Sequence, residues 1–227
     1  MVKTIGLSKA RKMTEIRLDG GELSLDFVNT IHDRSVTTPE DYLRVFEDLL
    51  DWLTLTKALP PEVMRGMKQA AGVNPRHAGE AFKTALAFRE VLHSVFSSVA
   101  RGAAIPAKDL STLNTTIGEA LRNIRVQQQG DGVVATWAFR KRELDQALWP
   151  IAKSAMDLLL SGDLHRVKEC PRCFWLFHDT TKNGRRKWCS MKTCGSIDKS
   201  LRYYYKRKSE ARTTAQVQTP LEKDRSE

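Results

Sequence analysis

Cys170-Pro171-Arg172-Cys173 and Cys189-Ser190-Met191-Lys192-Thr193-Cys194 together hold all four cysteines of this 227-residue chain. Fifteen residues separate the two pairs, so the spacing is C-x2-C-x15-C-x4-C. Each short loop can present both of its sulfur atoms to one point, and four thiolates can close a tetrahedron around Zn²⁺ at about 2.3 Å per zinc–sulfur bond. The spacing therefore predicts one structural zinc ion, with Cys170, Cys173, Cys189 and Cys194 as its ligands.

Two other uses of the cysteines compete with zinc. Disulfides need an oxidising compartment, but the sequence that follows Met1 has no apolar run of signal-peptide length, and no later stretch is apolar enough to span a membrane. An iron or iron–sulfur centre also accepts four thiolates, yet a closed set of four cysteines without a redox partner motif favours zinc. His165 and His178 flank the first pair and are alternative ligands, but with four cysteines available we expect them to be ordinary surface or packing histidines. We expect an intracellular, cytoplasmic protein without a membrane partner.

The net positive charge of the chain is concentrated around the cysteines. The chain has 37 Lys and Arg against 27 Asp and Glu, and its net charge is +10. Residues 165–208 contain thirteen Lys and Arg against three Asp and Glu, which is also +10, so the rest of the chain cancels. Dense positive charge on a metal-stiffened scaffold is typical of phosphate binding. We therefore expect a nucleic-acid partner, with DNA preferred over RNA, and a location at the nucleoid. The alternatives are a basic surface that is merely solvated and a binding site for an acidic protein.

A helix is predicted after the second cysteine pair, over residues 197–208. Ser196 is a good N-cap, and Lys206-Arg207-Lys208 would complement the helix dipole in the last turn. The residues expected to pack on one side are Ile197, Leu201 and Tyr204, opposite Lys199, Arg202, Tyr203 and Lys206. The predicted nucleic-acid contacts, in this helix and in the loop before Cys189, are Arg185, Arg186, Lys187, Lys199, Arg202, Lys206 and Arg207.

The loop between the cysteine pairs is predicted to form a hairpin. Asn183-Gly184 marks a tight turn, with short strands expected around Phe174–Phe177 and Lys187–Cys189. Such a turn would expose the arginines at its tip. Three aromatic residues of this loop can stack on bases, but in so small a module they are expected to cover the metal instead: Trp175, Phe177 and Trp188.

Two segments resemble a known bacterial family. The run from Cys170 through Asn183-Gly184-Arg185-Arg186-Lys187-Trp188-Cys189 to Cys194-Gly195 resembles the CGNR-type zinc finger, in which the four cysteines match the zinc ligands. The run Gly21-Glu22-Leu23-Ser24-Leu25-Asp26-Phe27-Val28-Asn29-Thr30, with Arg34 and Asp48–Trp52 after it, resembles the start of the ABATE domain. The resemblance implies a stress-induced transcriptional regulator.

This chain departs from the family pattern at one point. It reads Cys194-Gly195-Ser196-Ile197 where the family name implies Cys-Gly-Asn-Arg. Ser196 can still cap a helix as Asn would. Ile197 cannot replace the charge or the forked donors of an arginine, so a nucleic-acid contact is either lost or moved to Lys199 or Arg202, or else Ile197 joins the core of the module.

The rest of the chain predicts a mainly helical fold. We expect residues 1–14 to be disordered or frayed, 15–164 to form an ABATE-like helical domain, 165–208 to form the zinc module with two short strands and a helix, and 209–227 to be a disordered tail. Helices are predicted from Thr38-Pro39-Glu40-Asp41 onward, over about 80–101, after Pro106, and from Pro150 to Gly162. A small hairpin is predicted around Gly130-Asp131-Gly132.

The N-terminal domain has no catalytic signature in its sequence, so we expect a binding protein rather than an enzyme. Polar residues embedded in apolar helical contexts are candidates for a small-molecule effector pocket: Asp26, Asn29, Arg34 and Arg89, with Glu90 beside them. We favour a network of internal ion pairs and caps for these residues, because polar residues on helices that face a core are normally paired internally. We expect the N-terminal domain to serve as a sensor or in homodimer formation. The rival functions are RNA or ribosome binding, and an enzyme with a structural zinc module.

Overall fold

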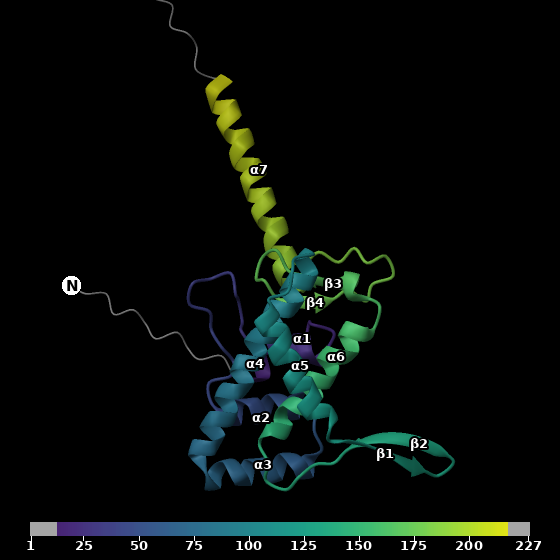
Figure 1. The fold of residues 1–227 in the computed structure, drawn as a ribbon. Helices are drawn as coiled ribbons and strands as arrows, with labels where there is room; N and C mark the ends of the chain where they lie inside the picture. The colour runs from purple at the N-terminus through teal and green to yellow at the C-terminus, as the bar shows by residue number, and fades with distance from the viewer. Residues whose placement is uncertain (1–12, 218–227) are drawn as a thin grey trace, which may run out of the picture. The chain divides into compact units, whose positions relative to one another are not determined.

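The computed structural model describes residues 13–217, which are mostly helical with two small antiparallel hairpins (Figure 1). Its elements are η1 (Met13–Glu15), α1 (Leu23–Val28), α2 (Phe46–Leu55), α3 (Pro61–Val73), α4 (Pro75–Arg101), α5 (Ala107–Leu121), β1 (Ile124–Gln129), β2 (Gly132–Trp137), η2 (Asp145–Leu148), α6 (Trp149–Leu160), η3 (Leu164–Arg166), β3 (Val167–Glu169), β4 (Leu176–His178), the π-turn η4 (Met191–Gly195) and α7 (Ser196–Val217). The chain divides into two compact units, of which the first ends at Cys189 and the second begins at Ser190.

The core of the first unit is built around the short helix α1. This helix contacts α4, α6 and strand β4, so its apolar side chains are enclosed: Leu25, Phe27 and Val28 are fully buried. Helix α4 packs against α5, and α5 against α6, while α2 and α3 close the end of the unit beside the start of α4 (Figure 1). The β1–β2 hairpin extends from this body (Figure 1).

Several of the predicted elements are present with nearly the expected bounds. Helix α4 ends at Arg101, where Gly102 takes the left-handed conformation (φ 63°) that stops a helix. Helix α5 follows Pro106, and α6 ends at Leu160. The predicted hairpin pairs β1 with β2, with Gly130 (φ 58°) in its turn. The pattern of apolar residues was sufficient for these elements.

The prediction for the first helix was wrong at its start. Helix α2 begins at Phe46, because the carboxylate of Asp48 accepts hydrogen bonds from the backbone N–H groups of Arg44 and Val45. Asp41, expected inside the first turn, instead forms an isolated β-bridge with Ile31. Helices α1 and α3 were not predicted.

The first half of the predicted zinc module is part of the first unit. Strand β3 packs on α4 and β4 packs on α1, and the side chains of Val167 and Leu176 join the hydrophobic core. The division between the two compact units lies after Cys189, inside the predicted zinc module of residues 165–208. The predicted hairpin was also wrong, because β4 pairs with β3 and residues 187–189 form no strand.

The second unit consists of the π-turn η4 and helix α7. Ser196 is not an N-cap, because the backbone is already helical from Met191, and its hydroxyl donates to the carbonyl oxygens of Lys192 and Thr193. Helix α7 continues to Val217, nine residues beyond the predicted end, so residues 209–217 are helical where a disordered tail was predicted. Residues 13 and 14, predicted to be disordered or frayed, lie in the 3-10 helix η1. The other residues predicted to be disordered, 1–12 and 218–227, lie outside the described part of the chain. Over residues 13–217, no helix has both the length and the apolar character needed to cross a membrane.

Candidate functional site

The four cysteines converge on one point. Cys170 and Cys173 lie in the turn between β3 and β4, Cys189 ends the basic loop that follows β4, and Cys194 lies in η4. Their sulfur atoms all lie within 4.8 Å of one another, and all four side chains are buried. The turn that holds the first pair is closed by a hydrogen bond from the N–H of Phe174 to the carbonyl oxygen of Cys170, 3.0 Å long.

This arrangement fits a structural zinc ion. In a tetrahedron with zinc–sulfur bonds of about 2.3 Å the sulfur atoms are about 3.8 Å apart, and the Sγ atoms of Cys173 and Cys189 are 3.5 Å apart. With four protein ligands no position stays open for water, so zinc serves to hold the fold.

A buried carboxylate organises the basic loop between the cysteine pairs. Asp179 is fully buried and accepts hydrogen bonds from the side chain of Lys168 (2.6 Å), from the N–H of Arg186 (2.8 Å) and from both the N–H and the hydroxyl of Thr181. Burial raises the pKa of Asp179, but these hydrogen bonds outweigh it and hold the pKa below its usual range. The loop is therefore a fixed structure rather than a hairpin tip.

Arg186 belongs to the same internal frame. Its guanidinium lies 4.5 Å from the ring centre of Phe177 and donates to the carbonyl oxygens of Asp19, Trp188 and Cys189. The prediction that Arg186 is an exposed nucleic-acid contact does not agree with this placement. The residues on either side, Arg185 and Lys187, are exposed.

The three aromatic residues of the loop that were considered for base stacking are buried. Trp175 and Phe177 are fully buried and Trp188 is 8% exposed. The indole Nε1 of Trp175 donates a 2.6 Å hydrogen bond to the carbonyl oxygen of Ile31, in the N-terminal segment. These rings are therefore unavailable for stacking on bases. His178 lies outside the cysteine cluster, where its ring faces Glu22 at 3.5 Å.

The remaining predicted contacts lie on α7, and this helix buries neither side. Ile197, Leu201 and Tyr204, which were predicted to pack, are 41%, 41% and 58% exposed. Ile197 is therefore not a core residue. The cationic residues of α7 are exposed as predicted: Lys199, Arg202, Lys206 and Arg207.

Three of the four predicted pocket residues are used to hold the fold together. The side chain of Asn29 accepts from the N–H of Leu176 (3.0 Å) and donates to its carbonyl oxygen (2.8 Å), so it pairs with β4 as a neighbouring strand would. Arg34 forms two hydrogen bonds with Glu90, of 2.8 and 3.1 Å. Arg89, only 3% exposed, forms two with Asp41, of 2.8 and 2.6 Å. These contacts match the alternative of internal ion pairs.

Asp26, the fourth predicted pocket residue, is a buried carboxyl group. Burial raises its pKa from 3.8 to about 7, the hydrogen bond from the N–H of Gly20 opposes the shift, and the charges of Asp19 and Glu22 add to it. A Cβ atom on Gly20 would lie 2.8 Å from the Oδ1 atom of Asp26, so the backbone approaches this carboxyl closely.

Asp26→Asn is expected to raise the stability of the protein above neutral pH. Because the carboxyl group of Asp26 binds its proton more tightly in the folded protein than in the unfolded chain, the contribution of Asp26 to stability is greatest below about pH 4 and falls as the pH rises to about 7. The amide of Asn carries no titrating proton, so it removes that loss, and its oxygen still accepts the hydrogen bond from the N–H of Gly20. At pH 8 we therefore expect the free energy of unfolding to rise by roughly 2 to 4 kcal/mol. Urea unfolding at pH 5 and pH 8 measures it, and an equal effect of the substitution at both pH values would contradict the assignment.

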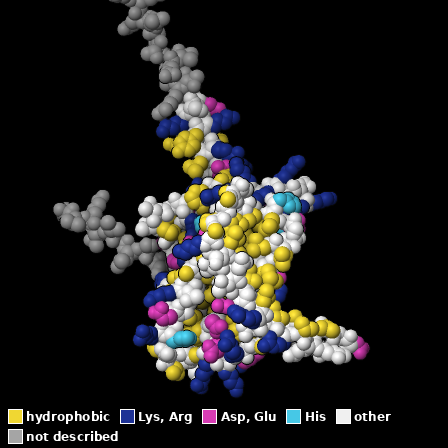
Figure 2. Space-filling model, viewed as in Figure 1, with side chains coloured by type: hydrophobic (Ala, Val, Ile, Leu, Met, Phe, Trp, Pro, Cys, Tyr) yellow, Lys and Arg dark blue, Asp and Glu magenta, His cyan; other side chains and the backbone are white. Residues whose placement is uncertain are grey.

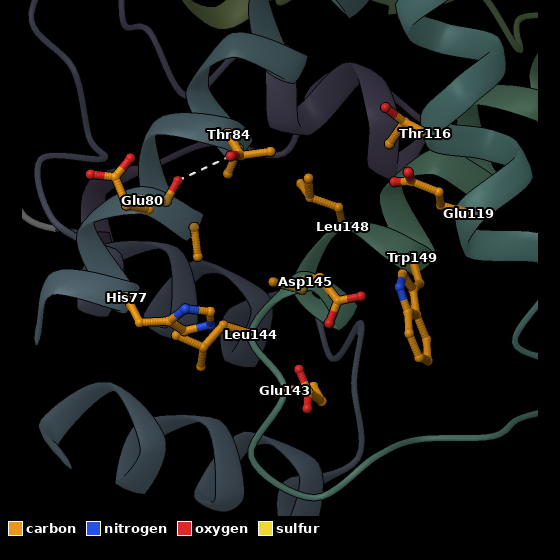
Figure 3. Close-up of a pocket in the computed structure, with 13 residues that line it drawn as sticks. His77, Glu80, Thr84, Thr116, Glu119, Glu143, Leu144, Asp145, Leu148 and Trp149 are labelled. Carbon is orange, nitrogen blue, oxygen red and sulfur yellow. Dashed lines mark hydrogen bonds between the residues drawn. The ribbon is translucent and has the colours of Figure 1, made fainter. Parts of the chain in front are cut away.

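The first unit has a cavity elsewhere, and none of the four predicted residues lines it. About 290 Å³ in volume, it lies between the start of α4, the end of α5 and the start of α6 (Figure 3). Leu144, Leu148 and Trp149 form apolar walls, and the carboxylates at its edge belong to Glu80, Glu119, Glu143 and Asp145. Two of these four carboxylates already form ion pairs, Glu80 with Lys83 and Asp145 with Arg140.

Comparison with known protein families finds a match for each of two parts of the chain. Residues 21–162 match the ABATE family, described as "Putative stress-induced transcription regulator", and residues 166–208 match the CGNR zinc finger. The sequence matches no curated protein. The ABATE match covers more than half of the chain, and the second match contains all four converging cysteines. The chain therefore belongs to the ABATE family and carries a CGNR zinc finger with one structural zinc site.

Proposed function

We propose that this protein is a transcription regulator that binds DNA through its zinc finger. The observation that supports it most directly is the charge: residues 165–208 account for the whole net charge of +10. Most of the exposed cations of this segment that the structure describes lie on α7 and in the loop before Cys189. The family description points to transcription, and therefore to DNA before RNA.

Helix α7 offers the most regular of these surfaces. Lys199, Arg202 and Lys206 are spaced by three and four residues, so they lie along one face. The side chains of Arg202 and Lys206 are 73% and 76% exposed, and their ion pairs with Asp198 and Glu210 are the exposed kind that contributes little. In Figure 2, Lys and Arg side chains run along this helix together with hydrophobic ones. A basic helix of this kind can enter the major groove of DNA.

The triple variant Lys199→Ala, Arg202→Ala, Lys206→Ala is expected to weaken DNA binding and flatten its salt dependence. Each phosphate contact contributes about 0.9 to the slope of log K against log salt concentration, so the slope should fall by roughly two to three. Fluorescence anisotropy with genomic DNA fragments between 50 and 300 mM salt measures it. The charge-matched control is Lys68→Ala, Lys108→Ala, Lys141→Ala, which changes three exposed cations of the N-terminal domain. Equal slopes for the two variants would contradict the proposal.

The proposal gives the N-terminal domain a regulatory rather than a catalytic role. Its support is that the polar residues singled out there, such as Arg34 and Arg89, are engaged in internal pairs. RNA binding is the competing function, since phosphate contacts alone do not separate the two nucleic acids. Competition between duplex DNA and structured RNA at equal salt distinguishes them, and a preference for RNA would overturn the assignment.

A further inference from the structure

A basic notch lies in the first unit where the end of α4 meets the zinc-finger loop. It has a volume of about 540 Å³. Its cationic lining residues are Arg101, Lys168, Arg185, Arg186 and Lys187, and Glu169 supplies a carboxylate. Two segments that are distant in the sequence, the C-terminal turn of α4 and the loop before Cys189, therefore bring cations to one place.

Two of the five cations, Lys168 and Arg186, are engaged in the internal frame. The ammonium group of Lys168 donates to the carboxylate of Asp179 and to the carbonyl oxygens of Gly184 and Arg186, which uses its three N–H bonds. Arg186 lies on Phe177 and donates to backbone carbonyls. These two residues shape the notch but have little left to offer a ligand.

The loop also carries two exposed cations, Arg185 and Lys187, which line the same notch. Arg186, which lies between them, is half-buried and is held by the frame. Lys187 lies 5.1 Å from the ring centre of Trp188 and forms no ion pair with a described carboxylate.

Arg101 is held in place on the other side of the notch. Its Nη2 donates to both carboxylate oxygens of Glu169, at 2.7 and 2.9 Å, and Glu169 also accepts from the hydroxyl of Ser97. This fixes the guanidinium while its Nε and Nη1 atoms donate to no described group, and the side chain remains 58% exposed. An arginine anchored on one edge and open on another is well suited to a phosphate oxygen.

We propose that Arg101, Arg185 and Lys187 form a clamp for one phosphate of the nucleic-acid backbone. The inference rests on the proposed function and extends it, because it makes α4 of the ABATE domain part of the binding surface and removes Arg186 from it. Glu169 is a positioning residue: it neutralises part of the charge of Arg101 and orients it. Such a contact sets the register of the protein on DNA without reading its sequence.

Arg101→Gln in the zinc-loaded full chain is the first test. The slope of log K against log salt concentration for DNA binding should fall by about one, and Arg101→Lys, which keeps the charge, should restore most of it. Because the three cations share one phosphate, the triple variant Arg101→Gln, Arg185→Gln, Lys187→Gln should lose little more slope than Arg101→Gln alone. A wild-type slope in Arg101→Gln, or a loss of about three in the triple variant, would overturn the clamp.

The controls separate this inference from the proposed function. Arg76→Gln changes an exposed arginine at the other end of α4 and should leave the slope unchanged. Arg186→Gln should lower the melting temperature, because it breaks the frame. If the α7 variant lowers the slope while Arg101→Gln does not, only the clamp fails; if the wild type binds no nucleic acid, both fail.

Discussion

Removal of zinc is expected to destabilise the ABATE domain together with the zinc finger. The turn that carries the first two cysteines is bonded to the N-terminal segment, since the N–H of Arg34 donates to the carbonyl oxygen of Cys173 at 3.0 Å and Trp175 donates to Ile31. Structural zinc contributes about 10 to 16 kcal/mol in small zinc-finger peptides, which is comparable to the whole stability of a domain of about 5 to 15 kcal/mol. Loss of the metal should therefore release contacts on both sides of this turn.

Hydrogen exchange with and without a chelator measures the effect. Amides between Asn29 and Arg34 should lose most of their protection on chelation and recover it when Zn²⁺ is added back. The β1–β2 hairpin forms no hydrogen bond with the cysteine turn, so its amides serve as an internal reference. If residues 29–34 kept their protection while only the finger exchanged faster, the two parts would be energetically separate, contrary to this expectation.

Asn29→Ala is expected to be among the most destabilising single substitutions in the chain. It leaves the N–H and the carbonyl oxygen of Leu176 without their partner, and both Asn29 and Leu176 are almost fully buried. An unsatisfied buried backbone group costs about 1 to 3 kcal/mol, so the free energy of unfolding should fall by roughly 2 to 5 kcal/mol. The midpoint of urea unfolding should fall with an unchanged slope.

Asn114→Ala is the matched control, because Asn114 is exposed on α5 and the same atoms are removed. Its effect should stay within about 0.5 kcal/mol. If Asn29→Ala were equally mild, its side chain would not be the strand partner that the distances describe. Asn29→Asp offers a second comparison, since it keeps the acceptor for Leu176 but loses the donor.

The sequence was sufficient for features that depend on local spacing. The zinc ligands follow from two short cysteine loops, and α4 and α5 follow from long apolar periodicity bounded by Gly102 and Pro106. The roles of Asn29 and Arg89 depend on partners that are distant in the sequence, namely Leu176 and Asp41. Periodicity contains no information on such pairs, so these residues resembled a pocket.

Other errors arose because tertiary contacts overrode local preference. Arg186 belongs to a run of three cations, and only the position of Asp179 and Phe177 shows that it points inward. Ile197 was predicted to pack in a core, but its side chain is 41% exposed.

Asn29, Ile31 and Arg34 lie in the ABATE match, and their hydrogen-bond partners Leu176, Trp175 and Cys173 lie in the CGNR match. The junction between the two matches, residues 163–165, is therefore a boundary in the sequence but not in the fold. Recombination at that junction would remove from the N-terminal half of the protein its strand β4, which covers α1, and would leave an apolar surface exposed. The two halves are thus expected to be inherited as a pair, and a finger exchanged between family members must bring matching partners for these three residues with it.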